Sequence, residues 1–203
     1  MQTSKEDIRA EILRQAAGIF GSRGFARSSM RDIAEAARVC PSNIYNYFPG
    51  KDALFREVVR PAVRSFDRML EEHHGRQGAD IMEMLSESYF RQVVEEYVLL
   101  LREYRTELQL LFFRAQGSSL EHYREEFTDR STMLVREYFR EMKRRHPQID
   151  VDVSDFFIHL HTAWMFTLFE ELLMHRTGPD ETERIVTEYI TFEITGWREL
   201  IKI

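Results

Sequence analysis

Apolar residues recur at helical spacing along nearly the whole chain. No run of alternating apolar and polar residues is long enough to build a sheet, so the pattern predicts an all-α protein of about nine helices. Glycine and proline punctuate the start of the chain at Gly24, Pro41 and Pro49-Gly50, which indicates three short helices there. Six longer helices are expected to follow. One of them covers about 79–103, and the next but one begins at a capping box of Ser118 and Glu121.

The second and third helices have the proportions of a helix-turn-helix unit, with a tight turn at Arg38-Val39. In such a unit the second helix enters the major groove of DNA. That helix begins at Pro41, where the missing N–H costs nothing, and extends to about Phe48. Ile44 and Phe48 are four residues apart and are expected to pack inward. This leaves a polar set to face solvent: Ser42, Asn43, Tyr45, Asn46 and Tyr47.

These polar side chains suit a DNA duplex. Tyr45 and Tyr47 lie about 200° apart on a helix, so each hydroxyl can donate to a phosphate on a different side of the groove. Ser42 and Asn43 stand at the front of the helix, where side chains meet base edges. Three more residues are expected to hold phosphates, by charge or by a helix N-terminus: Ser28, Ser29 and Lys51.

Charge is distributed unevenly along the chain, whose net charge is −6. Residues 1–52 contain eight Lys and Arg against six Asp and Glu, which gives +2, and the remainder contains twenty against twenty-eight, which gives −8. Only the N-terminal quarter is therefore suited to face a polyanion.

The run FGSRGFARSSMRDIAEAARVCPSNIYNYFPGKDALF resembles the DNA-binding region of the TetR family of bacterial transcriptional regulators, over about residues 8–55. The resemblance implies a homodimer that binds a palindromic operator, most simply a repressor that a small molecule releases. It divides the chain into a DNA-binding domain at 1–50 and a ligand-binding and dimerisation domain at 51–203.

By the same resemblance, two sets of residues fall at family contact positions. The positions that touch bases are Arg31, Pro41, Ser42 and Asn43, and those that hold phosphates are Ser29, Tyr45, Tyr47 and Lys51. Two residues depart from the family pattern. Arg38 replaces a turn glycine, so we expect a strained left-handed residue there. Cys40 replaces a serine at the helix cap and is expected to cap it weakly.

The penultimate helix is apolar nearly all round, so it needs burial on two sides. We expect one face to meet its own core and another to meet a second copy of the chain, with the last helix completing a four-helix bundle. The expected dimer residues are Phe156, Leu160, Leu168, Leu172, Tyr189, Phe192 and Trp197.

The middle of the chain carries many aromatic residues, most of which are expected in the core. Because the family builds its ligand pocket from the middle helices, some of them are expected to line a cavity for an apolar or aromatic effector. The candidates are Tyr89, Tyr97, Tyr104, Phe112, Phe113, Trp164 and Met165.

Other classes of function find less support. The chain has no Gly-rich phosphate loop, no metal-ligand spacing and no nucleophile beside a base, so we expect no enzyme activity, cofactor or metal. A helical interaction protein that has lost DNA binding is the main alternative. The charged start and the single cysteine favour a cytoplasmic protein without a membrane segment.

Overall fold

The computed structural model describes residues 4–76 and 78–202. These residues form nine α-helices and one 3₁₀ turn, and no strand occurs among them, which confirms the all-α prediction. The chain divides into two compact units. One combines residues 1–64 with 104–123, and the other combines 65–103 with 124–203.

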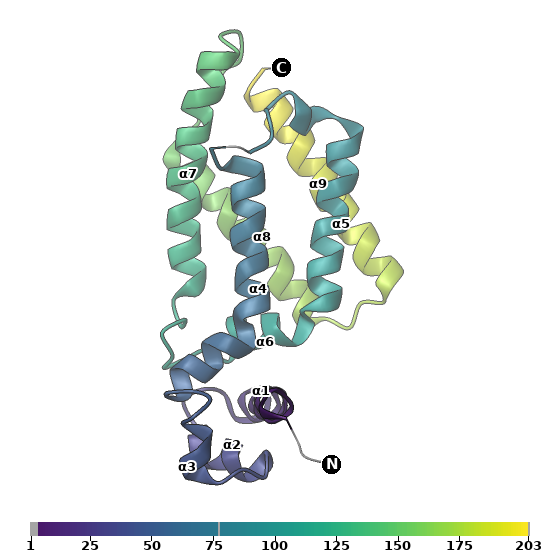
Figure 1. Cartoon of the computed structure of the whole chain (residues 1–203). Helices are drawn as coiled ribbons and strands as arrows, with labels where there is room; N and C mark the ends of the chain where they lie inside the picture. The colour runs from purple at the N-terminus through teal and green to yellow at the C-terminus, as the bar shows by residue number, and fades with distance from the viewer. Residues whose placement is uncertain (1–3, 77, 203) are drawn as a thin grey trace. The chain divides into compact units, whose positions relative to one another are not determined.

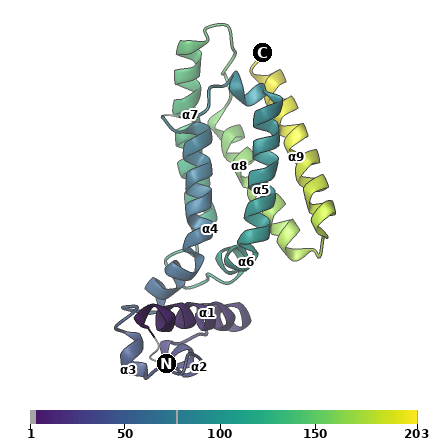
Figure 2. The same ribbon diagram turned by 45° about the vertical axis from the view of Figure 1, so that its right-hand side comes forward.

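The first unit contains the three N-terminal helices, of which the first is longer than expected, and two further helical segments. Its helices are α1 (Lys5–Arg23), α2 (Met30–Ala36), α3 (Pro41–Ile44), the start of α4 (Lys51–His74) and α6 (Arg105–Phe113). Helix α1 packs against both α2 and α6, and Figure 2 shows α1, α2 and α3 gathered together. Phe20, Phe25 and Phe55 form its aromatic centre, with ring centroids 5.1–6.0 Å apart.

Residues from the middle of the sequence are fastened to this unit by hydrogen bonds. The Phe25 N–H donates to the Arg114 carbonyl over 2.9 Å. The Asp52 carboxylate accepts from both the backbone N–H and the hydroxyl of Ser119, at 2.7 and 2.8 Å. The loop between α1 and α2 and the N-terminus of α4 therefore each depend on residues 104–123.

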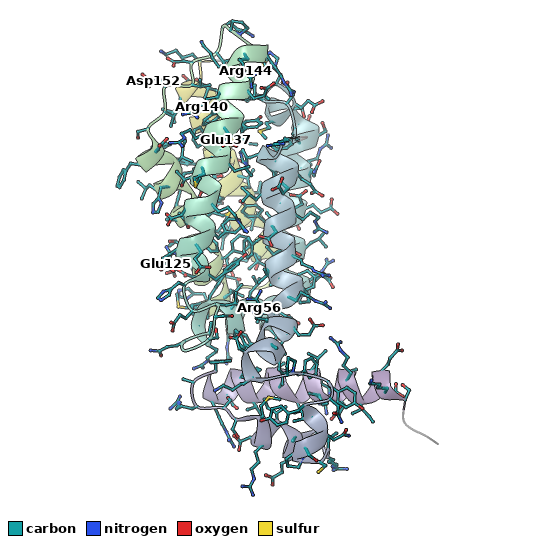
Figure 3. All side chains as sticks on the ribbon, turned by 60° about the vertical axis from the view of Figure 1, so that its left-hand side comes forward. Arg56, Glu125, Glu137, Arg140, Arg144 and Asp152 are labelled. Carbon is teal, nitrogen blue, oxygen red and sulfur yellow. The ribbon has the colours of Figure 1, made fainter. Side chains whose placement is uncertain are left out.

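The second unit contains the remaining helices. They are the end of α4, the 3₁₀ turn η1 (Glu83–Leu85), α5 (Glu87–Glu103), α7 (Tyr123–Arg145), α8 (Asp155–Met174) and α9 (Pro179–Leu200). Helices α5 and α9 run side by side (Figure 1). Helix α7 is amphipathic, because it buries Val135, Phe139 and Met142 and carries Glu137 and Arg140 on its exposed side (Figure 3).

Two helix boundaries differ from the expectation. The helix expected over 79–103 starts only at Glu87, because the Ser86 hydroxyl accepts from the Tyr89 N–H and caps α5 there. The capping box expected at Ser118 and Glu121 is wrong. Ser118 accepts from Leu120 and Glu121 accepts from Gly117, which closes a turn, and α7 starts only at Tyr123.

Arg38 adopts the left-handed conformation expected of a residue that replaces a turn glycine, with a φ of 55°. A residue with a Cβ atom pays about 1 kcal/mol or more for this conformation. Its side chain is exposed, so little packing is lost when it is shortened. Arg38→Gly is therefore expected to raise the free energy of unfolding of the first unit by about 1 kcal/mol, measured by urea denaturation followed by circular dichroism.

The matched control for this substitution is Arg31→Gly. Arg31 is also exposed but lies inside α2, where glycine destabilises a helix by roughly 0.5–1 kcal/mol. The two changes should have opposite signs. A loss of stability in both variants would show that the turn does not strain residue 38.

Candidate nucleic-acid interface and interior cavity

Helix α3 separates its apolar and polar side chains as its sequence predicts. Ile44 and Phe48 are buried, and Tyr45 exposes 54% of its surface. Only residues Pro41–Ile44 are α-helical, but the N–H groups of Tyr47 and Phe48 still bond to the Ile44 carbonyl and continue the helical turn. The exposed side of this short segment carries Ser42, Tyr45 and Asn46, and Asn43 and Tyr47 are half-buried.

Two amide side chains, one on α3 and one in the turn that follows it, are paired with each other. The Asn46 side chain donates to the Asn43 side-chain oxygen over 2.8 Å. The Asn43 amide N–H₂ is an additional donor group. The pair therefore fixes the direction in which the Asn43 donors point.

Cys40 sits at the start of α3 and makes no side-chain cap, as expected from its chemistry. Its thiol lies 3.1 Å from the Ser42 hydroxyl and is exposed. The hydrogen bond with Ser42 lowers the pKa of the Cys40 thiol. Arg31 and Pro41, which the resemblance also places at base-contacting positions, are both exposed.

Three residues expected to hold phosphates make hydrogen bonds within the protein. Ser28 is buried and donates to the Gly24 carbonyl over 2.6 Å. Ser29 caps α2 by accepting from the Asp32 N–H at 3.2 Å. The Lys51 ammonium donates to the carbonyls of Phe25 and Ser28, both at 2.8 Å. Since an ammonium has three donors, Lys51 keeps one N–H beyond those that hold the α1–α2 loop.

The second unit encloses a cavity of about 190 Å³ between α4, α5, α7, α8 and α9. Its walls are mainly apolar and aromatic. Three of the residues proposed from the sequence line it, namely Tyr89, Tyr97 and Met165. Tyr104, Phe112 and Phe113 belong to the first unit instead, and Trp164 is exposed on α8.

A set of polar side chains interrupts this apolar lining and was not foreseen from the sequence as part of a pocket. It comprises His73, His74, Ser131, His161, Thr162 and Glu193. A signal for Glu193 does exist in the sequence. Val186, Tyr189 and Ile190 are the buried residues of α9, and Glu193 continues that face at the i+3 and i+4 spacing.

The histidines at the end of α4 are fixed by neighbouring groups. His73 bonds to the Tyr89 hydroxyl through Nδ1 and to the Glu96 carboxylate through Nε2, the latter at 2.8 Å. Burial lowers the pKa of His74 to about 3, so this ring is neutral at pH 7. Burial also raises the pKa of the Tyr89 hydroxyl, which therefore stays protonated.

Helices α8 and α9 expose a group of large apolar side chains, here called the α8/α9 apolar face and made of Phe156, Leu160, Trp164 and Phe192. Phe156 and Phe192 are 74% and 66% exposed. The rings of Trp164 and Phe192 are 5.3 Å apart. Among the other residues expected at a dimer contact, Leu168 is half-buried and Leu172 and Tyr189 are buried, while Trp197 lines the cavity.

Comparison with known proteins assigns the helix-turn-helix segment. Residues 12–58 match the family described as bacterial regulatory proteins, tetR family. Residues 12–58 are a TetR-family domain. The residues of the second unit, 65–103 and 124–203, lie outside the matched segment.

Two relatives match part of the chain. The transcriptional regulator LuxR of Vibrio harveyi is 35% identical over 63 residues, which are 31% of each protein. The repressor Rv3405c of Mycobacterium tuberculosis is 35% identical over 83 residues, 41% of this chain and 43% of the relative. The chain thus matches less than half the length of either protein.

The fold of the whole chain has solved counterparts. The ketosteroid transcriptional regulator KstR2 of Mycobacterium tuberculosis aligns with a TM-score of 0.64 and 16% identity, over 97% of this chain and 96% of that one. At this identity the likeness concerns the fold alone. Within the described residues, none of the helices is long and apolar enough to cross a bilayer.

Proposed function

We propose that the protein is a homodimeric transcriptional regulator of the bacterial cytoplasm that binds a palindromic DNA operator and is released by a small molecule. One observation carries the proposal: a TetR-family domain presents Ser42, Tyr45 and Asn46 to solvent while it buries Ile44 and Phe48. Side chains of these types donate to phosphates and base edges in a major groove. The named relatives, a regulator and a repressor of transcription, support the same function.

The N-terminal and C-terminal parts of the chain have different proposed roles, and their charges differ accordingly. Residues 1 to about 50 contact DNA, and their charge of +2 contrasts with the acidic remainder. Like charges repel the acidic part from DNA, which leaves the TetR-family domains as the contact. Residues from about 51 to 203 would hold the effector in the cavity and form the dimer through the α8/α9 apolar face.

A band-shift experiment with DNA from upstream of the protein's own gene tests the proposal. A regulator should shift this DNA, and its affinity should fall steeply as salt rises because phosphate contacts release counterions. A helical interaction protein that has lost DNA binding should give no shift at any salt concentration. The absence of a shift with every fragment of the surrounding genome would refute the proposal.

Two substitutions on α3 separate the expected roles of its side chains. Tyr47→Phe removes one hydroxyl donor to phosphate and should weaken binding to all sequences alike, by about 1 kcal/mol. Asn43→Ala should instead reduce discrimination at one base position by about 1–3 kcal/mol. Binding selection from a randomised operator measures both effects.

Asn43→Ala also breaks the amide pair with Asn46, so Asn46→Ala serves as the control. That variant breaks the same pair but leaves the Asn43 amide in place. It should still prefer the same base at the Asn43 position, but less strongly than the unsubstituted protein, because the amide pair no longer holds the Asn43 donors in one direction. An equal loss at every position for Asn43→Ala would show that Asn43 does not read a base.

A further inference from the structure

The cavity of the second unit contains a carboxylate without a cation. Glu193 lines the cavity, and only 10% of its side chain is exposed. None of the described residues that line the cavity is Lys or Arg. His74 is neutral at pH 7 because burial lowers its pKa to about 3. A buried carboxylate is costly unless a donor or a positive charge accompanies it.

His161 does not supply that charge. The Trp197 indole N–H donates to His161 Nε2 over 2.9 Å. An indole N–H is only a donor, so the Nε2 atom that accepts from it carries no proton. If Nε2 were protonated, two N–H groups would face each other across this distance.

The same nitrogen lies next to Glu193. The Oε1 atom of Glu193 is 2.7 Å from His161 Nε2, but the pair does not have the geometry of a hydrogen bond and Oε1 is buried without a hydrogen-bond partner among the described residues. A carboxylate oxygen that faces a nitrogen lone pair is repelled by it. The Tyr189 hydroxyl also interacts with this carboxylate but carries no positive charge, so Glu193 still lacks a cation.

Glu96 shows what a satisfied carboxylate looks like in this unit. It accepts from His73 Nε2 over 2.8 Å and from the Gln92 amide over 2.9 Å. Glu193 differs because none of these donor types bonds to its Oε1, although the residue lines the cavity. The pKa of the Tyr97 hydroxyl in the cavity wall is raised, first by burial and then by the negative charge of Glu193.

We propose that the cavity binds a small aromatic amine, whose ammonium group donates to the Glu193 carboxylate while its ring lies among the aromatic side chains of the wall. The inference rests on the proposed function, because it names the chemical class of the effector. Tyr89, Tyr97, Tyr138 and Trp197 line the cavity, and aromatic faces also attract an ammonium group. A volume of about 190 Å³ suits one ring with a short chain.

Three probes of nearly equal size test this inference on the full-length protein without DNA: 2-phenylethylamine, 2-phenylethanol and phenylacetate. A charge-assisted hydrogen bond inside the cavity should make the amine bind at least about tenfold more tightly than the alcohol. Phenylacetate should bind more weakly than both because its carboxylate is repelled by that of Glu193. Isothermal titration calorimetry measures the three dissociation constants.

Glu193→Gln keeps the shape of the side chain and removes its charge. This variant should bind the amine and the alcohol with dissociation constants within about twofold of each other. Glu188→Gln is the matched control, because Glu188 is exposed on the same helix, and it should keep the full preference for the amine.

The inference is overturned if the unsubstituted protein binds the amine no better than the alcohol, or binds none of the probes. It is also overturned if Glu193→Gln keeps the preference. These results concern the cavity alone, because DNA is absent from the titration. Failure of the band shift would instead reject the regulator while leaving an amine site in place, so the two failures are distinguishable.

Discussion

Replacing Phe192 with glutamate is expected to turn the proposed dimer into monomers. Phe192 is 66% exposed and packs edge-on against Trp164 in the α8/α9 apolar face. A charge at the centre of an apolar contact would have to be buried without a partner. We expect the dimer dissociation constant to rise at least about a hundredfold, which is ~2.7 kcal/mol. Sedimentation equilibrium over a range of concentrations measures this change.

The expected effect on DNA follows from symmetry. The two domains of a dimer bind the two halves of a palindromic operator together, which raises the affinity. A monomer has a single domain and lacks this increase in affinity. Affinity for the full operator should therefore fall to that for a single half-site.

Met133→Glu is the control for Phe192→Glu. Met133 is also a large exposed apolar residue, 61% exposed, but it lies on α7, outside the α8/α9 apolar face. This variant should remain a dimer and keep full operator affinity. If Phe192→Glu remains a dimer at every concentration, the contact between copies lies elsewhere.

Phe66→Ala is expected to destabilise the second unit by about 3–5 kcal/mol. Phe66 is 1% exposed, and its ring contacts those of Phe127, Phe166 and Phe169 at centroid distances of 5.3–5.7 Å. Removing the ring takes away its burial and leaves a void that these neighbours cannot fill. The cost is a large fraction of the stability of a typical domain.

Tryptophan fluorescence during urea denaturation reports on this unit alone. The chain has two tryptophans, and both Trp164 and Trp197 belong to the second unit. Phe66→Leu keeps part of the buried volume and should lose clearly less stability than Phe66→Ala. Equal midpoints for the alanine variant and the unsubstituted protein, at the same protein concentration, would contradict the packing described here.

The local features of the fold could be predicted from the sequence because they depend on neighbours in the chain. Gly24 ends α1 with a positive φ, Ser29 caps α2 and Pro41 starts α3. The left-handed Arg38 was expected from the resemblance instead, since the TetR family has a glycine at this turn position. The end of α3 was harder to predict from the sequence. After Ile44 the backbone includes hydrogen bonds between residues three apart, which are tighter than those of an α-helix.

The cavity could be predicted only in part, because its lining combines helices that are distant in sequence. Aromatic content alone did not distinguish Tyr97 in the wall from Phe113, which belongs to the first unit. The hydrogen-bond conflict at His161 depends on Trp197 and Glu193, which lie more than thirty residues later in the sequence. Periodicity placed Trp197 on an apolar face but could not tell a dimer contact from a cavity wall.

The attachment of residues 104–123 to the first unit limits how such genes can recombine. A crossover that joined residues 1–64 to a foreign sensor would separate Phe25 from Arg114 and Asp52 from Ser119. The transplanted segment would then also expose the side of α1 that α6 covers. Chimaeras with new sensing properties should therefore fold only when the α6 segment is exchanged together with the N-terminal helices, or when the foreign sensor carries an equivalent segment.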